Sequence, residues 1–239
     1  MDRNRILTLA WLPFLLLFLG SCQRSASSPP PLPASTLESS PPAPRMISFP
    51  LALASTWIYD YRAHVEEQQA AWTVTETILG TQKRAGLLVA EVERIVSLRE
   101  GQPDDPLFMS PAANTSWYIL NGPNLFRQYQ TLAPEDTSQN TELVLVFPPE
   151  SVPCWPVNAG LGPQEVGASG CRYLSESLPF YETPAGYFEN CVELLTPYLS
   201  GSIRSVFCAN IGLVAEKYEH LGSPFGYELI LIGYSLHAQ

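Results

Sequence analysis

Side chains that perform acid–base or nucleophilic chemistry are few in this sequence, and their spacing matches no catalytic motif. The only imidazoles are His64, His220 and His237. The chain has no GxSxG nucleophile elbow, no HExxH zinc motif and no glycine-rich phosphate loop. We therefore predict no catalytic residue, no cofactor and no metal site. The alternative is a hydrolase with an unrecognised site, which requires a cleft where a histidine lies within hydrogen-bond reach of a carboxylate or a serine.

Paired acidic residues occur at three places, Glu66–Glu67, Glu91 with Glu93, and Asp104–Asp105. We interpret these carboxylates as solvated charges on strands and loops. Asp104–Asp105 and nearby carbonyl oxygens have the chemistry of a weak Ca²⁺ site, but the spacing of an EF-hand loop is absent.

Aromatic side chains give the best indication of a binding site. Five of them have the chemistry to line a pocket for an apolar or glycan ligand: Trp57, Tyr59, Tyr61, Trp72 and Trp117. The competing interpretation, which we favour, is that these rings fill the core of a curved sheet.

The cysteine at position 22 differs from the other four because of what precedes it. Arg3 and Arg5 are followed by the short apolar run Ile6–Gly20, which is the pattern of a secretory signal peptide and is too short to span a bilayer. The sequence Leu19-Gly-Ser-Cys22 resembles the bacterial lipobox, in which the peptide is cut before the cysteine and the thiol takes a diacylglyceryl group. We therefore predict a signal peptide at 1–21 and a lipid anchor on Cys22 that holds the chain to a membrane.

The segment after the anchor is a tether. Proline and serine supply 13 of the 23 residues of 23–45, so this segment cannot bury enough apolar surface to fold. We assign 22–45 to the lipidated cysteine and tether, and 46–239 to a single domain. Gln23 is not the aspartate that retains Gram-negative lipoproteins in the inner membrane, which favours the outer membrane or the cell surface.

Charge excludes one class of partner. The formal net charge is −10, and it becomes −11 once Asp2, Arg3 and Arg5 are removed with the signal peptide. No basic cluster occurs, so nucleic-acid binding is not expected.

Strand patterns dominate the domain. Trp57, Tyr59 and Tyr61 alternate with polar or smaller residues, which gives a period of two. Only 65–71 has the pattern of a helical turn. The other predicted strands are 71–79, 87–98, 116–120, 125–131, 142–147, 172–178, 187–196, 204–208, 212–219 and 227–236. We expect a mainly β fold, a curved antiparallel meander of about nine or ten strands that forms a half-barrel or flattened barrel with little helix.

The remaining cysteines, Cys154, Cys171, Cys191 and Cys208, are even in number in an exported chain, which indicates disulfides formed in an oxidising compartment. A four-residue hairpin loop at 198–201 places Cys191 directly opposite Cys208, within disulfide reach. We therefore favour the pairs 154–171 and 191–208 over the other two connectivities.

Several segments resemble a family of uncharacterised bacterial secreted proteins and lipoproteins. The opening Phe49–Tyr61 resembles their pattern PLxxGxxWxYxY, Pro184–Cys191 matches PAGxFxNC, and Ala209–Val214 is similar to AxGxGLV. Ala54 and Asn210 stand where this family has glycine. The resemblance implies a curved antiparallel sheet, either a half-barrel around a helix or a flattened barrel, similar in outline to envelope carriers of lipoproteins. It implies no catalytic residues.

These observations favour a membrane-anchored envelope lipoprotein that is not an enzyme and that works as a binding or structural β-module. Its expected partners are the membrane, through Cys22, and an envelope protein, a glycan or an apolar ligand. A carrier of a hydrophobic ligand or lipid is the alternative within this class. A solvent-accessible concavity larger than about 300 Å³ favours the carrier, whereas a filled interior favours protein–protein or structural work.

Overall fold

The computed structural model describes residues 49–101, 108–129, 141–157 and 171–237. The chain divides into two units, 1–41 and 42–239, and all described residues belong to the second. Cys22, the predicted signal peptide and the predicted tether lie outside the described residues.

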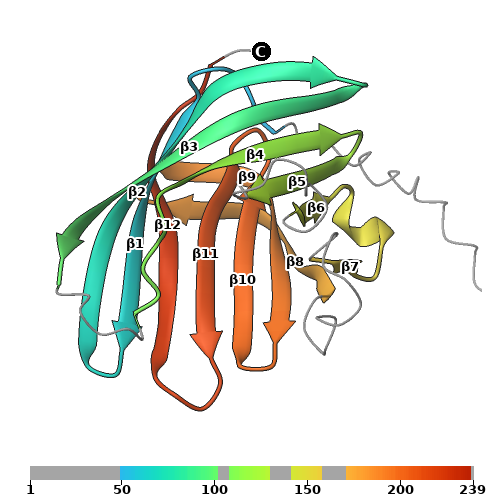
Figure 1. Cartoon of the computed structure of the whole chain (residues 1–239). Helices are drawn as coiled ribbons and strands as arrows, with labels where there is room; N and C mark the ends of the chain where they lie inside the picture. The colour runs from blue at the N-terminus through green and yellow to red at the C-terminus, as the bar shows by residue number, and fades with distance from the viewer. Residues whose placement is uncertain (1–48, 102–107, 130–140, 158–170, 238–239) are drawn as a thin grey trace, which may run out of the picture. The chain divides into compact units, whose positions relative to one another are not determined.

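The described part of the second unit is built almost entirely of strands (Figure 1). The elements are β1 (Thr56–Val65), β2 (Gln68–Arg84), β3 (Leu87–Glu100), β4 (Asn114–Asn121), β5 (Asn124–Tyr129), β6 (Thr141–Val146), η1 (Pro149–Ser151), β7 (Trp155–Pro156), β8 (Cys171–Thr183), β9 (Gly186–Tyr198), β10 (Gly201–Cys208), β11 (Gly212–His220) and β12 (Phe225–Ser235).

The strands form one antiparallel sheet in the order β6-β5-β4-β3-β2-β1-β12-β11-β10-β9-β8-β7. Every neighbouring pair is consecutive in the sequence except β1 and β12, whose register runs from Thr56 opposite Ser235 to Val65 opposite Phe225. The sheet curves until it is nearly closed like a barrel, and β4 and β5 cross in front of β10, β11 and β12 in Figure 1. The predicted curved antiparallel meander is thus confirmed.

Two details of the prediction are wrong. The sheet has twelve strands rather than nine or ten, and the strand that no pattern indicated is the two-residue β7. The predicted helical turn at 65–71 is the β1–β2 hairpin, where Glu66 has a φ of 55°. Within the described residues the helical element is the three-residue 3₁₀ turn η1, in line with the predicted small helix content.

Alternation along each strand directs one set of side chains into the curved sheet. In β1 the buried residues are Trp57, Tyr59, Tyr61, Ala63 and Val65. Two of these side chains reach across the interior to the β10–β11 connection and to β11: Trp57 Nε1 donates to Ile211 O at 2.8 Å, and Tyr59 Oη donates to Leu213 O at 3.2 Å. Because β12 separates β1 from β11 in the sheet, these bonds fix its curvature.

Two of the residues that have a left-handed backbone outside the strands are Ala54 and Asn210. Ala54, before β1, has a φ of 63°, and Asn210, in the β10–β11 turn, also has a φ of 63°. Asparagine adopts this conformation at little cost, whereas the Cβ of alanine makes it unfavourable. At both positions, the family of secreted proteins and lipoproteins that this sequence resembles has glycine.

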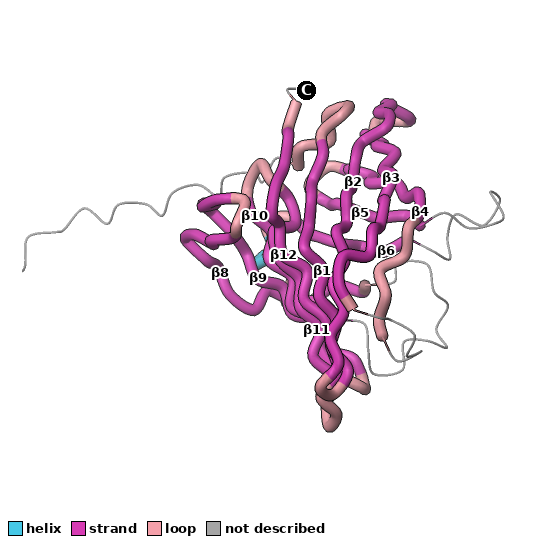
Figure 2. Tube along the Cα trace, turned by 90° about the vertical axis from the view of Figure 1, so that its left-hand side faces the viewer, coloured by secondary structure: helices cyan, strands magenta, loops and turns pink. Residues whose placement is uncertain are grey.

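The hairpin of β8 and β9 bends back on the sheet. Asn190, within β9, has a φ of 55°. Between this residue and its tip at 183–186, the hairpin runs behind β10, β11 and β12 (Figures 1 and 2). At its tip, Ala185 N donates to Leu231 O of β12 at 3.3 Å. Phe188 packs against Tyr234, with ring centroids 5.7 Å apart. The hairpin therefore covers the outer face of these strands, while the opposite face is free to enclose a cavity.

Candidate functional site

The concave face of the sheet holds a cavity of about 530 Å³ that is partly open to solvent. Strands from both halves of the sheet and the segment 108–112 contribute to its wall. The polar and aromatic members of the wall are Tyr61, Arg94, Ser110, Tyr118, Arg127, Tyr129, Glu142, Arg172, Ser205, Phe207, Glu216 and Tyr227. The wall is therefore charged in part, although it lies inside a β-domain.

A buried ion-pair network lies beside the cavity. The same oxygen of Glu76, Oε1, accepts from Arg94 Nη2 at 2.6 Å, Arg94 Nε at 2.8 Å and Arg127 Nη2 at 2.8 Å. The side chains of Glu76 and Arg127 are only 3% and 8% exposed, whereas Arg94 is 20% exposed. Because two arginines share one carboxylate, this cluster carries a net positive charge.

Neighbouring groups set the ionisation of this cluster. Burial by itself would raise the pKa of Glu76, but the charges of Arg127 and Arg94 and their hydrogen bonds outweigh it and hold the pKa at about 2. Burial raises the pKa of Tyr118 to about 12, so its hydroxyl is neutral near pH 7. The guanidinium carbon of Arg127 lies 5.1 Å from the ring centroid of Tyr118 and 5.2 Å from that of Tyr129, which are cation–π distances.

A second ion pair closes the seam between the two ends of the sheet. Arg172, on β8, is 5% exposed and donates through Nη2 to Glu142 Oε1 and through Nη1 to Val144 O, both at 2.8 Å and both on β6. Tyr129 Oη donates to the other oxygen of Glu142 at 3.1 Å. Arg172 thus joins β8 to β6 where the sheet is not continuous, and it lines the cavity there.

Glu216, on β11, has a different environment. Its carboxylate accepts hydrogen bonds from Tyr227 Oη at 2.8 Å and from Ser205 Oγ at 3.0 Å. No basic side chain in the described ranges forms an ion pair with it. Burial, together with this carboxylate, raises the pKa of Tyr227, so that Tyr227 stays a hydrogen-bond donor. The ring of Tyr61 stacks on that of Tyr227 at 5.0 Å.

The five predicted ligand-facing aromatic residues fall in different places. Tyr61 lines the cavity. Trp57 and Tyr59 are buried beside it around a hollow of about 10 Å³, too small to hold more than one water. Trp72 is buried against Tyr61, and Trp117 is half-buried next to the inward-facing Tyr118, on the opposite face of β4. Most of these rings are core residues.

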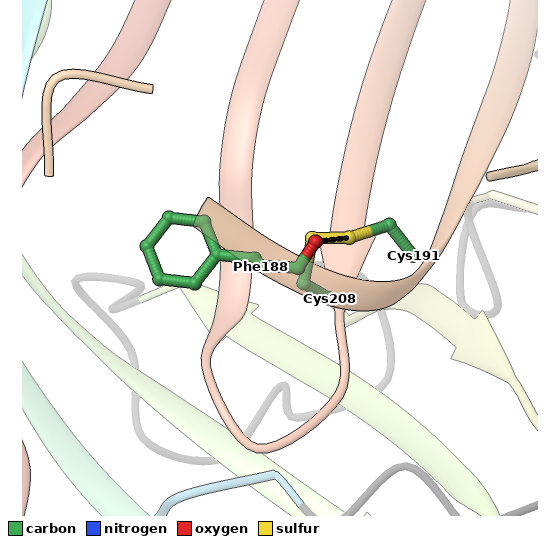
Figure 3. The surroundings of a disulfide bond; sticks show 3 residues. All are labelled: Phe188, Cys191 and Cys208. Atoms are coloured by element: carbon green, nitrogen blue, oxygen red, sulfur yellow. Dashed lines mark hydrogen bonds between the residues drawn. A yellow bond between two sulfur atoms is a disulfide. The ribbon is translucent and has the colours of Figure 1, made fainter. Parts of the chain in front are cut away.

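The remaining cysteines form the two predicted pairs, Cys154–Cys171 and Cys191–Cys208. Cys191 lies opposite Cys208 because Tyr198 and Gly201 pair at the end of the β9–β10 hairpin. Figure 3 shows this second disulfide with Phe188, whose carbonyl oxygen is 3.5 Å from Cys191 Sγ. Both sulfurs are buried, so the bond is part of the packing between the sheet and the bent β8–β9 hairpin.

The histidines lie outside the cavity. His220 Nδ1 is 2.7 Å from Ser223 Oγ, but this exposed pair occupies the β11–β12 turn. His64 is half-buried opposite Gly226, and His237 is exposed at the end of the described chain. Neither His64 nor His220 contributes to the cavity wall. A hydrolase site of the kind considered in the sequence analysis would therefore lie outside the cavity, or it would lie in the cavity and use neither His64 nor His220.

Among the described residues, no group of His, Cys, Asp or Glu is arranged to hold a metal ion. Asp104–Asp105, considered above for Ca²⁺, lies outside these residues. Glu66 and Glu67 are exposed in the β1–β2 turn, Glu91 is exposed and Glu93 half-buried on β3. Within the ranges that the structure describes, no helix is long and apolar enough to cross a membrane.

The charged wall of the cavity was not predicted from the sequence. Glu76 lies between the buried Val74 and Ile78 on β2, and Arg127 lies between Leu125 and Tyr129 on β5. A charged residue at an inward position of an alternating strand is thus the sequence signal that could have indicated a charged interior. It does not reveal which charges meet, because that depends on the curvature of the whole sheet.

Comparison with known proteins finds a likeness of fold. No protein-family model matches the chain, and no curated protein is significantly similar to it. A crystal structure from Bacteroides fragilis, described as an exported protein with a YmcC-like fold, matches with a TM-score of 0.50 and 10% identity, over 80% of this chain and 99% of that one. A protein from Parabacteroides distasonis described as a lipoprotein matches with a TM-score of 0.43 and 12% identity, over 78% and 97% of the two chains. At this identity the first likeness concerns the fold.

Proposed function

We propose that this protein is an exported lipoprotein, anchored through lipid on Cys22, whose β-domain binds a small ligand in its concave cavity without transforming it. The observation that carries the binding role is the cavity of about 530 Å³. Ligand pockets have volumes of about 300–1,000 Å³, whereas a structural module has no need of an unfilled interior.

The wall favours a ligand that has hydrogen-bonding groups as well as apolar surface. Phe207, Leu213 and Leu229 supply an apolar side, whereas Arg94, Glu142 and Glu216 supply charge. A wholly apolar acyl chain would strip water from these charges without replacing their hydrogen bonds, which is costly. A polar or amphipathic molecule therefore fits this cavity better than a simple lipid tail.

The proposed location is the cell envelope, at the outer membrane or the cell surface. The lipobox-like Leu19–Cys22 and the proline- and serine-rich 23–45 support a domain held near a membrane by lipid and a stalk. Two disulfides in one small domain support an oxidising compartment.

The anchor is tested by Cys22→Ser. We expect the variant to leave the membrane fraction and keep the β-rich circular dichroism spectrum of the parent. A variant that stays with the membrane after washing at high salt would refute the lipid anchor.

The binding role is tested by a matched pair of rim substitutions. Ala112 is exposed and lines the cavity, while the neighbouring Ala113 is exposed and does not. Native mass spectrometry of the Cys22→Ser protein is expected to show a bound small molecule, lost in Ala112→Trp and retained in Ala113→Trp. An unliganded mass, with no extract of the envelope able to add a ligand, would contradict the proposal.

A further inference from the structure

The charges around the cavity do not cancel locally. Glu76 faces two arginines, which leaves one positive charge in excess, and Glu142 is balanced by Arg172. Glu216 is the cavity carboxylate that has only hydroxyl donors among the described residues. One region of the wall is therefore negative and lacks a protein cation.

The three internal segments that the structure does not describe contain no lysine, arginine or histidine. The nearest basic residue in the sequence, Lys217, is exposed and pairs with Glu219 at 2.7 Å. The domain thus offers Glu216 no counter-ion of its own from these parts of the chain. Glu216 is half-buried, and a carboxylate that has lost part of its hydration is stabilised by a cation, because hydroxyl donors replace only part of that hydration.

A stack of aromatic rings begins at the same carboxylate. Tyr227, which donates to Glu216, stacks between Tyr61 at 5.0 Å and Tyr218 at 5.9 Å. These rings come from β12, β1 and β11, and Tyr61 and Tyr227 also line the cavity. The edges of these rings leave the carboxylate in a partly apolar surrounding, where an organic ammonium group, which carries apolar substituents, is a better counter-ion than a small hydrated cation.

We infer that the cavity binds a ligand with an organic ammonium group, which pairs with the Glu216 carboxylate beside the edge of the Tyr61 and Tyr227 rings. The apolar remainder of the ligand packs against Phe207, Leu213 and Leu229, which belong to the same wall. This inference rests on the proposed binding role and specifies its ligand class.

The test compares choline with 3,3-dimethylbutan-1-ol, a molecule of the same shape in which carbon replaces the charged nitrogen. Isothermal titration of the Cys22→Ser chain is expected to give a Kd for choline about tenfold lower than for the neutral analogue. In the additional variant Glu216→Gln the two values should become nearly equal. Tyr227→Phe, which keeps the carboxylate, should preserve the preference for choline.

The matched control is Glu219→Gln, on the same strand. It makes the same change of charge at an exposed position outside the cavity, so the preference for choline should not change. Thermal unfolding of each variant shows whether it is folded. If Glu216→Gln does not fold, titration of choline into Ala112→Trp supplies the comparison, because binding at the cavity must then weaken.

Two results would overturn the inference: equal affinity of the unsubstituted cavity for the two probes, or no binding of choline at millimolar concentration. If native mass spectrometry still finds a neutral or anionic molecule that Ala112→Trp displaces, the proposed function stands and only the ligand class fails. If nothing occupies or enters the cavity, both fail.

Discussion

At the scale of single residues, Glu76 is the carboxylate that neutralises the most buried positive charge. Its carboxylate holds Arg94 and Arg127, both mostly removed from water. Glu76→Gln would leave two buried guanidinium groups without a counter-charge, and removing one partner of a buried pair costs about 3–5 kcal/mol. We expect a loss of this size in the free energy of unfolding measured with urea.

The control for this loss is Glu193→Gln. Glu193 pairs with Arg204 at 2.8 Å, but the arginine is 45% exposed, so the change should cost less than about 1 kcal/mol. Similar losses in the two variants would show that the buried network is not stabilising in the way described.

Protonation of Glu76 also predicts a pH dependence. Its pKa falls from the ordinary 4.5 to about 2 in the folded protein, because the two arginine charges outweigh the burial that opposes ionisation. A depressed folded-state pKa stabilises the fold above the unfolded value, and this contribution is lost as the pH falls. The parent should therefore lose more stability than Glu76→Gln between pH 4.5 and 2. Parallel stability curves over this range would contradict the assignment.

Ala54 is a residue at which the sequence is not optimal for its backbone. Its φ of 63° costs about 1–2 kcal/mol for an L-residue, and glycine would remove this cost. The greater entropy of glycine in the unfolded chain would offset part of the resulting stabilisation. Ala54→Gly should stabilise the domain by about 0.5–1 kcal/mol, measured by urea unfolding. Ala113→Gly, at an exposed position with no positive φ, should destabilise it slightly. Destabilisation by both would show that Ala54 is not strained.

At the scale of elements, the two disulfides differ in access although each joins residues 17 apart. Cys191 and Cys208 are buried under the bent β8–β9 hairpin, whereas Cys154 is exposed at the start of β7. Because reduction requires a thiolate to reach a sulfur, dithiothreitol under native conditions should open 154–171 first. Alkylation followed by mass spectrometry would identify the cysteines released. Earlier release of Cys191 and Cys208 would mean that the hairpin opens readily.

The strands themselves were largely predictable from the sequence, whereas the contacts between side chains of distant strands were not. Alternation indicated a strand for all but one of the twelve, and the short β9–β10 loop set the register that places Cys191 opposite Cys208. β7 escaped because two residues have no period. The cavity wall escaped because Arg94, Arg172 and Glu216 come from strands far apart in the sheet order, and only closure brings them together.

At the scale of the whole domain, the order of strands in the sheet follows the chain except at one place. The first and last strands, β1 and β12, are paired in the middle of the sheet. The two ends of the sheet, β6 and β7, are consecutive in the sequence, whereas β1 and β12 are neighbours from opposite ends of the chain. Thr56 lies opposite Ser235, and His237 N donates to Ser55 Oγ at 3.2 Å, so the ends of the folded chain are adjacent. The β1–β12 pairing is thus the contact with the greatest loop-closure entropy.

This arrangement predicts the behaviour of a circular permutant. Joining residue 237 to residue 49 by a short Gly/Ser linker and opening the chain between the exposed Glu150 and Ser151 makes all twelve strands sequential neighbours, with both disulfides intact. The one long-range strand pairing becomes local, so the permutant should fold faster than the parent. Arg172 still joins β8 to β6, so the cavity and its ligand affinity should survive. Stopped-flow refolding with the disulfides intact measures the rate, and a permutant that refolds more slowly would show that β1–β12 pairing does not limit folding.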